Sequence, residues 1–188
     1  MNAKVQIHLS KQLIAYYNAV DMFEAYSLAA EITAQLQTLI NQISKSTVQI
    51  KKYAQESKIH PDTFSELENL ISISEYLSSS QASNFDFERE KYRRERDVSK
   101  EQYDANDLYD AYSLAHESTL WLQTMFHQIK DEAESIKQEF IAPKLGAGIF
   151  TNLERLIHIA GYLSDRHADS LNIEREKYEE ELEDFKNA

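Results

Sequence analysis

Apolar residues recur at alternating intervals of three and four along two long stretches of the chain. In the first stretch they are Ala19, Met22, Tyr26, Ala29, Thr33, Leu36, Ile40, Ile43, Thr47, Ile50 and Ala54. In the second they are Ala105, Leu108, Tyr112, Ala115, Thr119, Leu122, Phe126, Ile129, Ala133, Ile136 and Phe140. A period near 3.5 residues, sustained over this length, predicts long helices that pack at a shallow angle in coiled-coil fashion. Each would be about 40 residues and about 60 Å long.

Each long stretch ends at a helix-breaking segment, SKIHPD at 57–62 and PKLGAG at 143–148. Proline ends helices because it lacks an amide donor and clashes with the preceding turn. A second helical pattern then follows in each half, with apolar positions at Phe64, Leu67, Leu70, Ile71, Leu77 and Phe85, and at Phe150, Leu153, Leu156, Ile157, Leu163 and Leu171. Its serine-rich part, 78–84, is expected to be a weak but continuous stretch of helix. Each half therefore predicts a helical hairpin.

The two halves are copies of one 86-residue unit. Residues 17–102 align on 103–188 at a constant offset, and 35 of the 86 positions are identical. The runs AYSLA and EREKY, which mark the register, belong to no motif that we can connect with an activity. Residues 1–102 are expected to form one hairpin and residues 103–188 a second, within one shared bundle. The predicted fold is all-α, an antiparallel four-helix bundle made of two tandem hairpins with long, coiled-coil-like helices.

The junction between the two halves allows two interpretations. Ser99 and Gln102 have the spacing of a capping box, which favours a turn and the start of a new helix there. However, no glycine or proline lies within 62–142. The alternative therefore fuses the second and third helices, so that two chains complete each other's bundles as a domain-swapped dimer.

Composition narrows the function classes. The chain of 188 residues has a net charge of −12, of which residues 103–188 carry −10 with 8 basic and 18 acidic side chains. Such a charge disfavours nucleic-acid binding, which neutralises phosphates with lysine and arginine. The absence of cysteine excludes disulfides and thiol chemistry. No stretch is apolar enough for a signal peptide or a membrane span, so we expect a cytoplasmic protein with no membrane partner.

The sequence offers no catalytic, cofactor or metal constellation. Carboxylate-bridged metal sites in bundles use Glu-x-x-His, which does not occur here. No serine lies in a glycine-flanked nucleophile elbow. Four histidines of the second half have no histidine at the matched positions of the first half. A metal site built by duplication would have its ligands in both halves. The four histidines are His116, His127, His158 and His167, opposite Ala30, Asn41, Ser72 and Gln81.

Four polar residues interrupt the inward apolar stripes. Gln81 and His167 occupy matched positions, where a polar side chain fixes helix register at some cost in stability or contacts a ligand. Arg89 and Arg175 continue the stripe within EREKY. Small residues opposite would leave room for an arginine stem whose guanidinium reaches the edge of the bundle. Binding of an anionic partner is the alternative role for these two arginines.

The copies also differ at positions that suggest an interaction surface. These positions are Trp121 and Met125, which replace Gln35 and Leu39, and Arg93 and Arg94, whose matched positions are Glu179 and Glu180. If the helix ends that carry these residues met, within the chain or across a dimer, their opposite charges would determine how the two helices are oriented in the contact. The sequence thus favours a non-enzymatic protein that binds a protein partner or self-associates. An acidic inhibitor of a basic target such as a nuclease, and a small-molecule or metal binder, are the alternatives.

Overall fold

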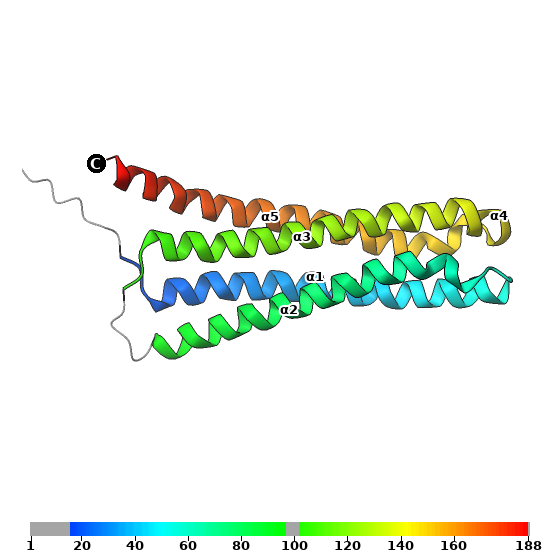
Figure 1. Ribbon diagram of the computed structural model, residues 1–188, viewed down its shortest axis with the longest axis horizontal. Coiled ribbons are helices and arrows are strands. Elements are labelled where there is room, and N and C mark those ends of the chain that lie inside the picture. The colour runs from blue at the N-terminus through cyan, green and yellow to red at the C-terminus, as the bar shows by residue number, and fades with distance from the viewer. Residues whose placement is uncertain (1–15, 97–101, 188) are drawn as a thin grey trace, which may run out of the picture.

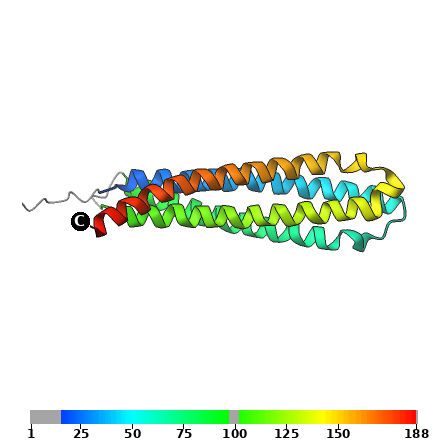
Figure 2. The ribbon, with the colours of Figure 1, turned by 90° about the horizontal axis from the view of Figure 1, so that it is seen from above.

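The computed structural model describes residues 16–96 and 102–187, and in these residues four long helices form an antiparallel bundle (Figures 1 and 2). They are α1 (Ala19–Glu56), α2 (Ser65–Glu95), α3 (Ala105–Ile136) and α5 (Thr151–Lys186). α1 packs along α2 and α3 along α5, and the two hairpins join through α1 with α5, α2 with α3, and α1 with α3. The predicted all-α four-helix bundle is confirmed. We call the end with the two hairpin connections the loop end and the other the open end.

The second and third helices are separate, so the fused alternative is wrong. Ser99 lies outside the described residues, but Gln102 is not helical, and the cap expected there is therefore wrong as well. The helix begins later because Asp104 is a better cap. Its carboxylate accepts from the Asp107 backbone N–H at 3.2 Å, and the Asp107 carboxylate accepts from the Asp104 N–H at 3.0 Å. This reciprocal pair satisfies two amide donors that the first turn leaves free.

The expected apolar seams of α1 and α3 form the core, with Tyr26 only partly buried. The second helices add Phe64 and Phe150, both fully buried at matched positions near the loop end. Burial of this apolar surface is the main term that favours folding.

Phe140 is the one seam position that the structure corrects, because it is 42% exposed while the next residue, Ile141, is fully buried. Lys137–Ile141 forms a π-helical turn, which adds one residue to the helix and rotates everything after it. A strict three–four pattern therefore selects the wrong residue at this point. The short helix α4 (Ala142–Leu145) and a 3-10 turn, Ala147–Phe150, complete the connection to α5.

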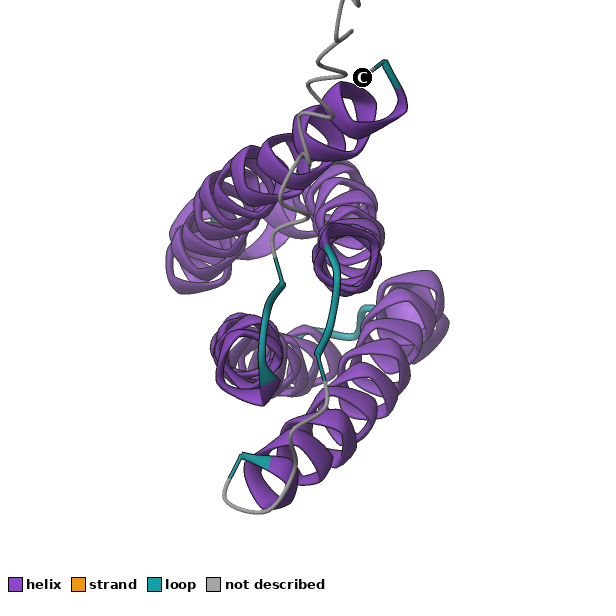
Figure 3. Ribbon diagram, turned by 90° about the vertical axis from the view of Figure 1, so that its left-hand side faces the viewer, coloured by secondary structure: helices purple, strands orange, loops and turns teal. Residues whose placement is uncertain are grey.

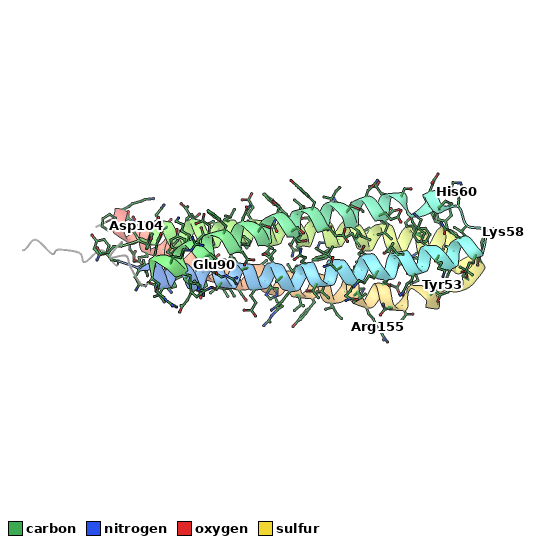
Figure 4. All side chains as sticks on the ribbon, turned by 90° about the horizontal axis from the view of Figure 1, so that it is seen from below. Tyr53, Lys58, His60, Glu90, Asp104 and Arg155 are labelled. Carbon is green, nitrogen blue, oxygen red and sulfur yellow. The ribbon has the colours of Figure 1, made fainter. Side chains whose placement is uncertain are left out.

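The two halves meet at the open end through matched residues. Tyr17 and Tyr103, which are 86 positions apart, exchange both backbone hydrogen bonds at 2.9 Å each. The Tyr17 hydroxyl donates to Glu181 at 2.5 Å, and the Tyr103 hydroxyl donates to Glu95 at 2.5 Å. Because Glu95 and Glu181 are also 86 positions apart, these contacts follow an approximate twofold axis along the bundle. Asp104 marks this end, opposite Lys58 and His60 at the loop end (Figure 4).

Candidate interaction surfaces

Trp121 lies half-exposed, at 48%, on the face where α3 meets α2. Leu114, seven residues earlier on the same side of α3, is similarly exposed. The middle of α2 lies beside them, since the Gln81 side chain donates to the Ser118 carbonyl at 3.4 Å. Residues 76–85 of α2 and 118–129 of α3 contain no Asp, Glu, Lys or Arg. The exposed Glu117 lies between Leu114 and Trp121, so the uncharged part of the α2–α3 face begins at Ser118 and contains Trp121 but not Leu114.

Met125 does not belong to this surface, contrary to the expectation from sequence. It is 9% exposed and packs inward, because it lies seven residues after the buried Ser118 and shares its side of the helix. Sequence reasoning missed Leu114, whose counterpart Leu28 is only partly exposed. The seven-residue spacing of Leu114 and Trp121 was the signal that could have identified the pair.

The matched face, between α1 and α5, is polar. The His167 Nε2 lies 3.1 Å from the Gln35 Oε1, and burial lowers the pKa of this histidine. Gln35 and Trp121 occupy matched positions, as do His167 and Gln81. The tryptophan therefore stands where the other half has a glutamine that is hydrogen-bonded to the neighbouring helix.

Of the four polar residues expected on the inward stripes, Gln81 is the most buried, at 7% exposure. His167, Arg89 and Arg175 are partly exposed. Arg89 pairs with Asp86 on its own helix at 2.9 Å. The Arg175 Nε is buried without a hydrogen-bond partner among the described residues. Arg89 thus keeps its charge near the edge of the bundle, whereas part of the Arg175 guanidinium is buried.

An open groove of about 540 Å³ runs between α3 and α5. Its polar lining includes His116, His127, Asp165 and Asp169. Burial, followed by the charge of Arg175, lowers the pKa of His116. Even so, no group of three or more His, Asp and Glu in the described part of the chain is arranged to hold a metal ion.

The oppositely charged helix ends do not meet within the chain. Seen from the open end, the last turns of α2 and α5 lie on opposite sides of the bundle with α1 and α3 between them (Figure 3). Arg93 pairs with Glu90 at 3.0 Å on its own helix, and Arg94 is exposed. Glu180 is exposed at the other end and Glu179 is partly exposed. The within-chain contact is therefore wrong, and a contact across two chains stays a prediction.

The tyrosines at the open end form a packing cluster. Tyr26 stacks on Tyr92 with ring centroids 5.5 Å apart, and Tyr112 stacks on Tyr178 at 5.7 Å. Burial raises the pKa of Tyr26 to about 12 and raises the pKa of Tyr112 above its usual value. Tyr26 and Tyr112 are therefore uncharged at neutral pH, which suits a cluster that joins four helices.

Comparisons with family models, curated proteins and solved structures found no match for this chain. None of the helices in the described ranges is long and apolar enough to cross a membrane. The surfaces above are thus the basis for any functional assignment.

Proposed function

We propose that this chain is a non-enzymatic protein that acts by binding a protein partner through the α2–α3 face. The observation that carries the proposal is the half-exposed Trp121 in the uncharged stretch 118–129 of α3, beside the uncharged stretch 76–85 of α2. The cores of protein interfaces are depleted of charge and enriched in aromatic residues, and tryptophan is prominent among the side chains that dominate binding energy.

The fold itself does not demand a tryptophan at this position. The other half has Gln35 at the matched site of α1, and the Gln35 side chain lies 3.1 Å from the His167 Nε2 of α5. Trp121 adds exposed apolar area, which a lone bundle gains nothing from displaying. A partner that covers it would remove that area from water.

The test is capture of partners from cells of the source organism with tagged protein, comparing wild type with Trp121→Gln. This substitution installs the residue of the matched position, so we expect the bundle to remain folded and the partner to be lost. Phe140→Gln is the control, because Phe140 is an exposed aromatic residue near the loop end. We expect it to retain the partner. An unchanged set of captured proteins with Trp121→Gln would overturn the proposal.

An acidic inhibitor of a basic target is the second candidate, favoured by the last turns of α5. Within the described chain, no ion pair neutralises the carboxylates of Glu179, Glu180, Glu183 and Asp184. Association driven by these groups should slow steeply as salt is added, because exposed charges are screened beyond about 10 Å at 0.1 M. Binding centred on Trp121 should show a nearly flat association rate over the same salt range.

A further inference from the structure

The most exposed large apolar side chains among the described residues lie on the two outer helices. Tyr76, Phe87, Tyr162 and Ile173 are between 63% and 73% exposed. With the half-exposed Ile73 and Ile159 they form two matched sets. We call Ile73, Tyr76 and Phe87 the α2 ladder, and Ile159, Tyr162 and Ile173 the α5 ladder.

Both ladders face away from the core. At 100° per residue, the spacings of three and eleven residues place each ladder within about 60° of the helix circumference. The buried residues of α2, such as Ser78 and Phe85, lie on the other side. α2 and α5 lie on opposite sides of the bundle (Figure 3), so one ladder faces outward on each side. An amphipathic helix needs only its inner stripe to be apolar, and the bundle therefore does not require these side chains.

The charges at the ends of the two ladders have opposite signs. On α2, Glu66 lies seven residues before Ile73 and Arg94 lies seven residues after Phe87. On α5, Arg155 precedes the ladder and points away from the bundle (Figure 4), and Glu180 lies seven residues after Ile173. All four charged side chains are exposed, and none of them forms an ion pair with another described residue.

We propose that a second copy of this chain packs its α5 ladder against the α2 ladder of the first, with the two helices parallel. Each residue is then level with its counterpart, so that the apolar side chains meet and Arg94 faces Glu180 of the other copy. Glu66 faces Asn152 and lies about one helical turn from Arg155. The contact spans about 42 Å of helix between Glu66 and Arg94. The lysines on these faces, Lys91 and Lys177, are already paired with glutamates of their own helices.

This arrangement leaves fewer like charges in contact than pairing the α5 ladder with itself. An antiparallel α5–α5 contact would bring the run of carboxylates at 179–184 against the single Arg155. An antiparallel α2–α2 contact would pair Glu66 with Arg94 but would leave Glu179 and Glu180 without a partner. The parallel α2–α5 contact instead places Arg93 and Arg94 against Glu179 and Glu180. Because the two ladders lie on different sides of one chain, the contact is heterologous, and it generates rows or rings larger than a dimer. It uses neither Trp121 nor Leu114 and goes beyond the proposed function.

The test uses two charge-reversal variants of the full chain, Arg93→Glu with Arg94→Glu and Glu179→Arg with Glu180→Arg. Mass is measured by sedimentation over a range of concentrations at low salt. For the wild type we expect the mass to rise from the 21.9 kDa of one chain to beyond that of a dimer, and to fall when salt is added. Each variant alone should associate at least about tenfold more weakly, because two ion pairs become like-charge contacts. An equimolar mixture of the two should regain wild-type association, because opposite charges meet again at every contact.

Two controls test whether the association of chains is caused instead by net charge or by the Trp121 surface. Lys45→Glu with Lys52→Glu changes two exposed lysines of α1 and alters the net charge as the arginine variant does. It should associate like the wild type, and so should Trp121→Gln. A wild type that stays monomeric, a mass that stops at the dimer, or a variant mixture that fails to recover would each overturn the proposal. Loss of association in either control would overturn it as well. The partner captured through Trp121 is expected to be the same for both charge-reversal variants.

Discussion

The two hairpins have matching interiors and different exteriors. Phe64 and Phe150 are fully buried at the same level, and the bridges from Lys51 to Glu68 and from Lys137 to Glu154 join the helices of each hairpin at matched positions. The surfaces, by contrast, differ in charge and in the placement of aromatic residues. The comparison indicates that the fold constrains the interior more than the exterior. The exterior residues were thus free to differ between the two halves.

The largest expected effect tests whether the two interiors are one core. Phe64→Ala and Phe150→Ala should each lower the free energy of unfolding by about 3–5 kcal/mol, because each leaves a cavity in a packed interior. If the hairpins share one core, each variant keeps a single transition and the two midpoints fall by similar amounts. Urea unfolding followed by circular dichroism measures both.

Separate transitions in either variant would show that the hairpins unfold independently, which contradicts the shared core. Tyr53→Ala is a suitable control, because this residue of α1 is exposed near the loop end (Figure 4) and should change stability by less than about 0.5 kcal/mol.

The connections at the loop end differ more than the helices they join. After α1 the chain turns through Lys58, whose φ is 58°, while the Ile59 N–H bonds to the Ala54 carbonyl at 3.0 Å. This is the left-handed helix ending that usually has glycine. After α4 the chain turns through Gly146, with φ 80° and ψ 148°. That conformation lies in a region of φ and ψ occupied almost only by glycine.

Substitutions at these two turn residues should change the stability of the protein in opposite directions. Gly146→Ala should destabilise the protein by about 1–3 kcal/mol because alanine is strained at this φ and ψ. A steric clash adds nothing to this effect, because no atom lies within 4 Å of the position that the new Cβ would occupy. Lys58→Gly should stabilise it by up to about 1 kcal/mol, because glycine adopts positive φ without strain. Thermal unfolding of both variants checks the pair. A stabilising Gly146→Ala would show that the second connection differs from the one described here.

Most of the fold could be predicted because burial and helix period depend on local sequence. The 78–84 segment was expected to remain helical and does so, although the Ser78 hydroxyl bonds back to the Glu75 carbonyl of the same helix. The start of α3 and the π-helical turn could not be predicted as readily. Asp104 competes with Ser99 as a cap, and the extra residue in the turn changes which side chain faces inward, Ile141 rather than Phe140. The first outcome depends on local competition between two caps, and the second depends on tertiary packing.

The candidate surfaces were only partly predictable. Trp121 could be identified as a departure from the repeat, but the burial of Met125 depends on the rotation of α3 against α2. The oppositely charged ends could be identified from sequence, whereas their placement on opposite sides of the bundle follows from the way the hairpins dock. The two ladders could not be identified as departures from the repeat, because Ile73 and Tyr76 are identical to their counterparts.

The smallest expected effect is the change in stability with pH that comes from two histidines of the second hairpin, His116 and His167. The first hairpin has no histidine at the matched positions. Burial lowers the pKa of both His116 and His167, so the folded protein binds their protons less readily than the unfolded chain does. Stability from this source is present above their usual pKa, near 6.5, and is lost as the pH falls through that value. Both rings are partly exposed and therefore screened, so the free energy of unfolding should fall by only about 0.5 kcal/mol between pH 7.5 and pH 5.0.

The variant His116→Ala with His167→Gln installs the residues of the first hairpin, which do not titrate. Urea midpoints at the two pH values should then differ less in this variant than in the wild type, and equal differences would show that other groups determine the acid sensitivity.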